Sequence, residues 1–188
     1  MKATALAAAA AAALASTPAL AQDWYVRGDV NANFNTRLDS SPPVRGHDGW
    51  GLDVGIGRDL GSGFRADGEV LFLKSEGRDG LTDHQKAVGG FLNGYYDFNK
   101  GGALQPFVGV GIGVAHVNLD GGAYRGHDTG FAYQAKAGVG YRFSDRLTGE
   151  VAYRYLGAPD LRIGDQPFEA KGDYRAQTVS VGLRYKLG

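Results

Sequence analysis

The 188-residue sequence predicts an all-β fold, an eight-stranded antiparallel up-and-down barrel that spans a membrane. Three observations lead to this prediction. Apolar and polar residues alternate with period two in eight segments, these segments are long, and short and long connections alternate between them. The composition agrees with it. The chain has 31 glycines, ten tyrosines and nine phenylalanines, which suits a narrow barrel that buries small residues and shows aromatic rings outside.

The alternation is clearest in the first segment, WYVRGDVNANFN at residues 24–35. Successive side chains of a strand point to opposite sides. The even-numbered residues from Trp24 to Phe34 would therefore form an apolar face, and the odd-numbered residues from Tyr25 to Asn35 a polar one. At roughly nine to fifteen residues, such segments can cross a bilayer at the usual tilt, whereas strands in soluble sandwiches average about six residues. Seven further segments repeat the pattern, at residues 50–57, 64–72, 88–98, 104–114, 131–143, 147–155 and 178–187.

The connections fall into two classes. Tight turns rich in Gly, Asn, Asp and Ser are predicted at Leu60–Gly63, Asn99–Ala103 and Ser144–Arg146. Between them, longer polar loops are predicted near Thr36–Asp48, Ser75–His84, Asn118–Thr129 and Gly157–Asp173. An even number of strands places both chain ends at the rim with the short turns. That rim would be periplasmic, and the long loops extracellular.

The N-terminus has the pattern of a cleavable signal peptide over residues 1–21, which leaves residues 22–188 for the barrel. Lys2 supplies the positive charge, Ala3–Ala15 a short apolar core, and Ala19-Leu20-Ala21 an A-x-A cleavage site. The alternative, a membrane anchor, needs about 20 apolar residues.

Cysteine is absent, which excludes thiol catalysis and disulfides. The 20 basic and 20 acidic residues cancel, so charge gives no basis for a nucleic-acid partner.

The same periodicity would suit a soluble lipocalin-like barrel with its apolar face inside. Residue size favours the membrane barrel instead, because the polar face is full of Gly, Ala and Ser, as a narrow interior requires. The apolar face carries large residues, and aromatic ones lie towards strand ends, where interfacial girdles occur in membrane barrels. These predicted interfacial aromatics are Trp24, Trp50, Phe72, Phe98, Phe143, Tyr153, Tyr155 and Tyr185.

Two segments support a family comparison: QPFVGVGIGVAHV at residues 105–117 and GFAYQAKAGVGYRFSDRLTGEVAYRYL at residues 130–156. Through them the chain resembles the OmpA-like transmembrane domain and related outer-membrane β-barrel proteins of Gram-negative bacteria, and the similarity covers the whole mature chain. The resemblance implies outer-membrane lipids, lipopolysaccharide and the barrel-insertion machinery as partners. We expect the chain to depart from full-length OmpA proteins by stopping at the barrel, without their peptidoglycan-binding domain. It also ends in Tyr185-Lys186-Leu187-Gly188 rather than in an aromatic residue.

Charged residues on the polar face are the most informative candidates for a site. Buried charges must be paired or solvated, and an eight-stranded lumen is just wide enough for side chains to fill. We therefore predict an ion-pair network that closes the lumen, with a narrow gated channel as the alternative. Glu150 and Arg154 share one strand, so each should pair with a neighbouring strand, for example with Lys136 or Glu69. The predicted network comprises Arg27, Asp29, Asp53, Arg65, Asp67, Glu69, Lys136, Glu150, Arg154 and Arg184.

The sequence predicts no catalytic, cofactor or metal site. His116 falls on the outer face near a rim with no serine nucleophile beside it, which argues against a lipid A-modifying enzyme. RGHD occurs twice, at Arg45–Asp48 and Arg125–Asp128, where loops enter strands. Each copy suits a polar loop end, a divalent-cation site or a contact with lipopolysaccharide phosphates.

The resulting functional hypothesis is a non-enzymatic outer-membrane protein that contributes to envelope integrity and displays surface loops. The alternatives are a small-solute channel, a lipid A-modifying enzyme and a surface adhesin. Adhesion is a possibility that the family resemblance implies. Loops carry the binding function of many scaffolds, but their mixed charges here identify no partner.

Overall fold

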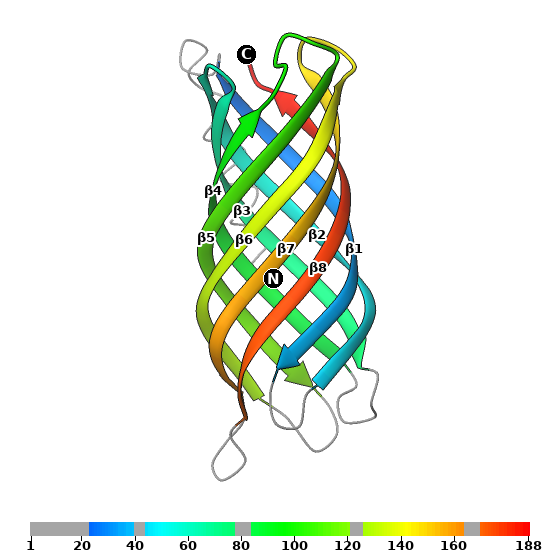
Figure 1. Ribbon diagram of the computed structural model, residues 1–188, viewed down its shortest axis with the longest axis vertical. Helices are drawn as coiled ribbons and strands as arrows, with labels where there is room; N and C mark the ends of the chain where they lie inside the picture. Colours follow the sequence, from blue (N-terminus) through cyan, green and yellow to red (C-terminus); the bar gives the residue numbers. More distant parts are fainter. Residues whose placement is uncertain (1–22, 40–43, 78–83, 121–125, 164–169) are drawn as a thin grey trace, which may run out of the picture.

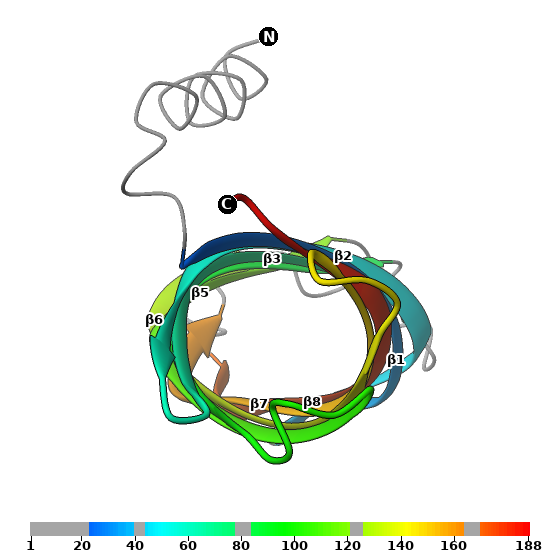
Figure 2. The same cartoon turned by 90° about the horizontal axis from the view of Figure 1, so that it is seen from above.

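A computed structural model describes residues 23–39, 44–77, 84–120, 126–163 and 170–188. Within these ranges the chain forms one closed barrel of eight antiparallel strands, in which each strand pairs with the next and β8 pairs with β1 (Figures 1 and 2). The predicted fold class is confirmed. The described ranges contain no helix long and apolar enough to cross a membrane. The strands are β1 (Trp24–Asp39), β2 (Val44–Gly61), β3 (Phe64–Gly77), β4 (His84–Asp97), β5 (Leu104–Asp120), β6 (Gly126–Arg142), β7 (Leu147–Ile163) and β8 (Ala170–Lys186).

The three short turns lie together at one rim, where the chain also ends (Figure 1). In the β2–β3 turn, Gly61 and Gly63 have φ of 83° and 89°, a conformation that glycine adopts without a steric penalty. The Leu187 amide donates to the Trp24 carbonyl at 2.9 Å, so the start of the first strand and the end of the last one meet at this rim. The predicted signal peptide, residues 1–21, lies outside the described residues.

The strands are longer than the sequence pattern predicts, from 14 residues in β3 to 18 in β2. They continue into the predicted loops: Leu38 pairs with Val44 within the expected loop 36–48, and Ile163 pairs with Ala170 within the expected loop 157–173. Apolar and polar residues alternate only in the part of a strand that has lipid on one side and the polar lumen on the other. Beyond the bilayer the backbone ladder can continue without that pattern, which is why the loop boundaries were wrong.

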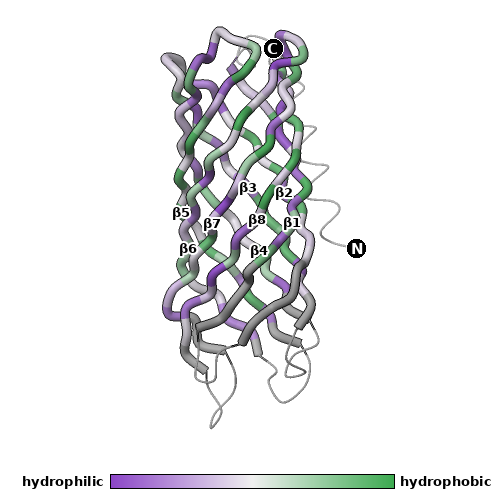
Figure 3. The backbone as a smooth tube through the Cα atoms, turned by 45° about the vertical axis from the view of Figure 1, so that its right-hand side comes forward, coloured by the Kyte–Doolittle hydropathy of each residue, from purple (hydrophilic) through white to green (hydrophobic). Residues whose placement is uncertain are grey.

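Apolar residues face outwards and charged residues inwards. Val110 is 70% exposed and Leu92 is 72% exposed, while Arg65 and Asp53 are each 2% exposed. Figure 3 shows the resulting alternation of hydropathy along the strands. A soluble protein does not expose a continuous apolar belt of this extent, so the belt faces lipid. The predicted orientation of the two faces is therefore confirmed, and the soluble lipocalin-like alternative is excluded.

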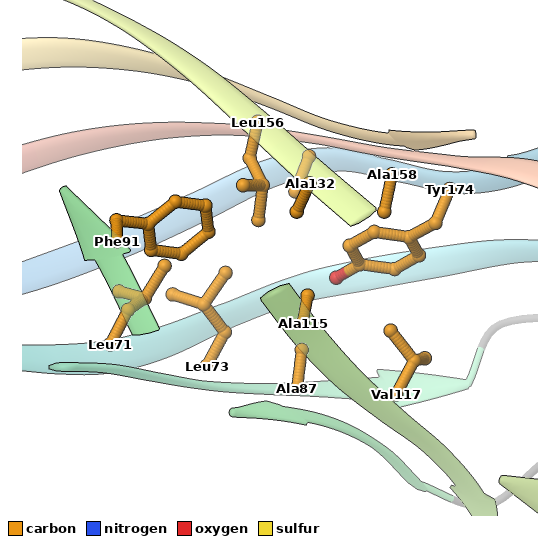
Figure 4. Close-up of a cluster of buried hydrophobic side chains, with 11 residues drawn as sticks. Leu71, Leu73, Ala87, Phe91, Ala115, Val117, Ala132, Leu156, Ala158 and Tyr174 are labelled. Carbon is orange, nitrogen blue, oxygen red and sulfur yellow. The ribbon is translucent and has the colours of Figure 1, made fainter. Parts of the chain in front are cut away.

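The interior also contains an apolar cluster near the long-loop rim, which the sequence reasoning did not predict (Figure 4). Leu71 and Leu73 from β3 pack with Phe91 from β4 and Leu156 from β7, and all four are almost fully buried. We call this set the apolar layer. Its members are Leu71, Leu73, Ala87, Phe91, Ala115, Val117, Ala132, Leu156, Ala158, Tyr174 and Ala176.

Candidate functional site

The barrel interior between the apolar layer and the short-turn rim holds a group of charged side chains that we call the lumen cluster. The structure places all ten predicted network residues inside the barrel and adds Asp97. They come from every strand except β5. The cations are Arg27, Arg65, Lys136, Arg154 and Arg184, and the carboxylates are Asp29, Asp53, Asp67, Glu69, Asp97 and Glu150.

Arg27 on β1 is the centre of the lumen cluster. Its Nη1 lies 2.7 Å from Asp53 Oδ1, and its Nε donates to Asp67 Oδ2 at 2.8 Å. The same guanidinium also forms ion pairs with Asp29 and Glu69. The fork of donors on arginine suits such multiple contacts. One side chain thus ties together carboxylates from β1, β2 and β3.

Glu69 on β3 links this centre to the opposite side of the barrel. It pairs with Arg27, with Lys136 on β6 and with Arg154 on β7, whose Nη2 lies 3.1 Å from Glu69 Oε1. The same Arg154 Nη2 lies 2.7 Å from Asp53 Oδ2. Because β3 and β7 are not neighbours, these contacts brace the barrel across its width rather than along the wall.

A second group of ion pairs lies nearer the short-turn rim. Arg65 Nε donates to Asp97 Oδ1 at 2.9 Å, and Arg184 Nε donates to Glu150 Oε1 at 2.8 Å. Arg65 Nη2 lies 3.5 Å from Glu150 Oε1 and joins the two pairs. Asp97 was absent from the predicted network. Its position between the outward Tyr96 and Phe98 would have identified it as inward-facing.

The pairing of Glu150 differs from the expected one. Its cations are Arg184 and Arg65, and not Lys136. The reason is the register of β6 and β7, in which Lys136 lies opposite Arg154 while Glu150 lies opposite Gly140. Glu150 is therefore four residues nearer the short-turn rim than Arg154, and only two residues from Thr148, which lies opposite Arg184.

Aromatic rings complete the packing around Arg65. The guanidinium carbon lies 4.3 Å from the Tyr95 ring centroid and 4.9 Å from the Phe107 centroid, within the range of cation–π contacts. Glycines make room for these rings, because a Cβ at Gly109 on β5 would lie 2.3 Å from Tyr95 Cδ1 and one at Gly138 on β6 would lie 2.7 Å from Phe107 Cζ. The sequence reasoning missed Tyr95 and Phe107, although strand alternation places both on the inner face.

Little free space remains in the lumen cluster. The cavity that Arg27, Tyr95 and Glu150 help to line holds about 10 Å³, close to the least that a single water molecule needs. At the short-turn mouth, a cavity between Asp59, Lys100 and neighbouring side chains holds about 20 Å³. Each of these two cavities is thus close to the size of one or two water molecules.

The eight predicted interfacial aromatics all lie on the outer face of the barrel. Two tiers are visible in the contacts. Tyr96 and Phe98 pack edge to face at 4.9 Å near the short turns, and Trp50 packs with Phe72 at 6.0 Å nearer the long loops. All eight are exposed or half-buried, namely Trp24, Trp50, Phe72, Phe98, Phe143, Tyr153, Tyr155 and Tyr185.

Two of the four histidines lie together on the outer face near the long-loop rim. The rings of His116 on β5 and His127 on β6 have centroids 5.5 Å apart, and His116 Nδ1 lies 2.8 Å from Thr129 Oγ1. His127 belongs to the second RGHD sequence. The side chains of the first, at residues 45–48, lie outside the described residues.

Comparison with known proteins agrees with this architecture. Residues 3–186 match the family described as "Outer membrane protein beta-barrel domain". The chain belongs to this family. Among proteins of similar sequence, an uncharacterised Brucella abortus protein is 25% identical over 90% of this chain and 86% of its own length. A Rickettsia prowazekii protein, provisionally named an adhesin, is 23% identical over 97% of both chains.

Solved structures show the same outer-membrane barrel fold. Neisserial surface protein A superposes with a TM-score of 0.65 at 19% identity, over 87% of this chain and 97% of that one. The family, the closed barrel and the outward apolar belt together place the protein in the bacterial outer membrane.

Proposed function

We propose that the protein is a structural component of the outer membrane, with a closed lumen, that contributes to envelope integrity and presents the four hairpin ends opposite the short turns outside the cell. The observation that carries this proposal is the lumen cluster. Its eleven charged side chains from seven strands pair with one another across the barrel interior. The two cavities that these side chains line hold about 20 and 10 Å³.

Two physically different barriers support a closed lumen over a channel. A solute entering from the short-turn rim would first have to separate buried ion pairs, and removing one partner of such a pair costs about 3–5 kcal/mol. It would then have to cross the apolar layer, where Leu73, Phe91 and Leu156 offer no compensation for a lost hydration shell. A solute that suits one barrier is poorly suited to the other.

The outer surface supports a role as a stable, lipid-embedded platform. Its aromatic residues, including Phe143 and Tyr185 near one rim and Trp50 near the other, are placed to form interfacial girdles. We propose that lipopolysaccharide contacts the outer girdle and that the barrel-insertion machinery places the chain in the membrane. We also propose that the protein is not an enzyme and acts without a cofactor.

Surface recognition is the second part of the proposal. The relative provisionally named an adhesin aligns over 97% of both chains, and a rigid barrel that holds loops outside the cell suits adhesion. Cells displaying the protein should bind a host-cell surface better than cells displaying a variant with shortened connections. Equal binding would leave envelope integrity as the role.

Planar-bilayer recording of the refolded protein tests the closed lumen. We expect no stable current steps from the wild type. A matched variant with Leu73→Ala and Leu156→Ala thins the apolar layer but keeps the lumen cluster, and should also remain silent. Regular conductance steps from the wild type would favour the channel.

In cells, loss of the protein should increase sensitivity to detergent, while the mass of lipid A should stay unchanged.

A further inference from the structure

His116 and His127 form a cross-strand pair that the closed-lumen function does not use. In the β5–β6 register His116 lies opposite Thr129 and His127 lies opposite Asn118, so the two histidines are diagonal neighbours on the outer face. His116 is half-buried and His127 exposed. Val114 on β5 and Phe131 on β6 are the outermost residues of the apolar belt beneath them. The pair therefore lies at the outer edge of the bilayer, within reach of solvent.

The spacing of the two rings suits one shared metal ion. Two imidazoles on a tetrahedral metal, each with a metal–nitrogen distance of about 2.0–2.1 Å, have ring centroids about 5 Å apart. The observed centroid distance is 5.5 Å, with the ring planes inclined by 48°. The observed separation is thus close to that of two imidazoles on one metal ion.

A hydrogen bond prepares His116 for this role. Its Nδ1 lies 2.8 Å from Thr129 Oγ1, and with Nδ1 as the donor the lone pair is on Nε2. Metal-binding histidines almost always donate their second ring N–H to an oxygen in this way, because the bond fixes the tautomer and the orientation of the ring. Thr129 would thus hold His116 with Nε2 available to a metal.

We propose that His116 and His127 bind a divalent transition metal, Zn²⁺ or Cu²⁺, at the outer edge of the membrane. Neutral imidazole suits these two ions, while Mg²⁺ and Ca²⁺ prefer oxygen ligands. Among the described residues, no group of three or more His, Cys, Asp or Glu side chains is placed to hold a metal. The site is therefore a two-histidine site, and oxygen donors from outside the chain, such as water, complete the coordination.

Titration of the refolded mature protein in detergent micelles with Zn²⁺ tests the proposal. We expect one saturable site in the wild type and an affinity at least tenfold weaker in His116→Gln and in His127→Gln. Thr129→Val should weaken binding by about 10–100-fold, the usual effect of losing such a supporting hydrogen bond. The matched control is His47→Gln in the other RGHD sequence, which should bind Zn²⁺ as the wild type does.

Two further observations keep the test decisive. A heat-dependent gel shift shows whether each variant has folded. Electron paramagnetic resonance of the wild type with one equivalent of Cu²⁺ should show coupling to two imidazole nitrogens, without need of any variant. Wild-type protein without saturable Zn²⁺ binding, a Cu²⁺ spectrum without nitrogen coupling, or binding lost in His47→Gln but kept in His116→Gln would each overturn the proposal.

Discussion

Replacing Glu69 by Gln removes one negative charge from the lumen cluster with almost no change of shape. The structure allows its effect to be worked out. Glu69 pairs with Arg27, Lys136 and Arg154. Arg27 and Arg154 keep Asp53 as a partner after the change, but Lys136 loses the carboxylate with which it pairs. Leaving a buried charge unpaired costs about 3–5 kcal/mol. We therefore expect the free energy of unfolding to fall by this amount.

A second substitution separates the unpaired charge from general damage. Lys136→Met removes the cation itself, so adding it to Glu69→Gln should restore part of the stability. The combined loss should be smaller than the sum of the two single losses by about 0.5–3 kcal/mol, the usual coupling between residues in one network. If the losses simply add, Lys136 does not depend on Glu69.

Urea unfolding of the refolded protein in lipid vesicles measures these differences. With a slope of about 2 kcal/mol per molar urea, a loss of 4 kcal/mol lowers the midpoint by about 2 M. The matched control is Asp23→Asn, because Asp23 pairs with Arg58 at 3.5 Å and both side chains are more than half exposed. Such surface pairs contribute about 0–1 kcal/mol. A Glu69→Gln protein within about 1 kcal/mol of the wild type would refute the reasoning.

Three further predictions concern the wall and the interior. Gly113→Ala should destabilise the barrel by about 1–3 kcal/mol or more, because a Cβ there would lie 2.0 Å from the Gly90 carbonyl oxygen. At Gly94 an added Cβ would point into open space, so Gly94→Ala should change the free energy of unfolding by no more than about 0.5 kcal/mol. Equal effects of the two glycine substitutions would contradict the predicted clash at Gly113. Leu73→Ala should cost about 2–5 kcal/mol in the same assay, since Leu73 is 2% exposed, and an unchanged midpoint would show that the apolar layer is not tightly packed. Val110→Arg places a charge on the lipid-facing belt and should cost about 2–4 kcal/mol in vesicles; a neutral effect there would mean that Val110 does not face acyl chains.

Most of the wall could be predicted from the sequence because a membrane barrel gives each strand two different surroundings. Residues 24–35 alternate at every position, and the structure follows that alternation from Trp24 to Phe34 in β1. The lumen residues were found in the same way, since Arg27 and Asp29 have the parity of the inner face. Asp97, Tyr95 and Phe107 obey the same rule. They were missed only because the alternation was not used to identify every inward-facing residue of their strands.

The apolar layer could not be found from polarity alone. Leu71, Leu73 and Phe91 interrupt the polar face with residues that belong on the apolar one, so the local pattern gives no reason to place them inside. Their positions follow from the parity of β3 and β4 and from the closed barrel, which brings Leu156 from β7 against them.

The amino-acid sequence by itself determined the number of strands, the position of the short turns and the side of each strand that faces lipid. These properties depend on neighbours one or two residues apart, and the period of a strand records them directly. Tertiary structure alone decided which charges meet. The contact of Arg154 with Asp53 joins residues 101 positions apart in the chain, and only closure of the barrel and the register of its strands bring such residues to the same level of the lumen.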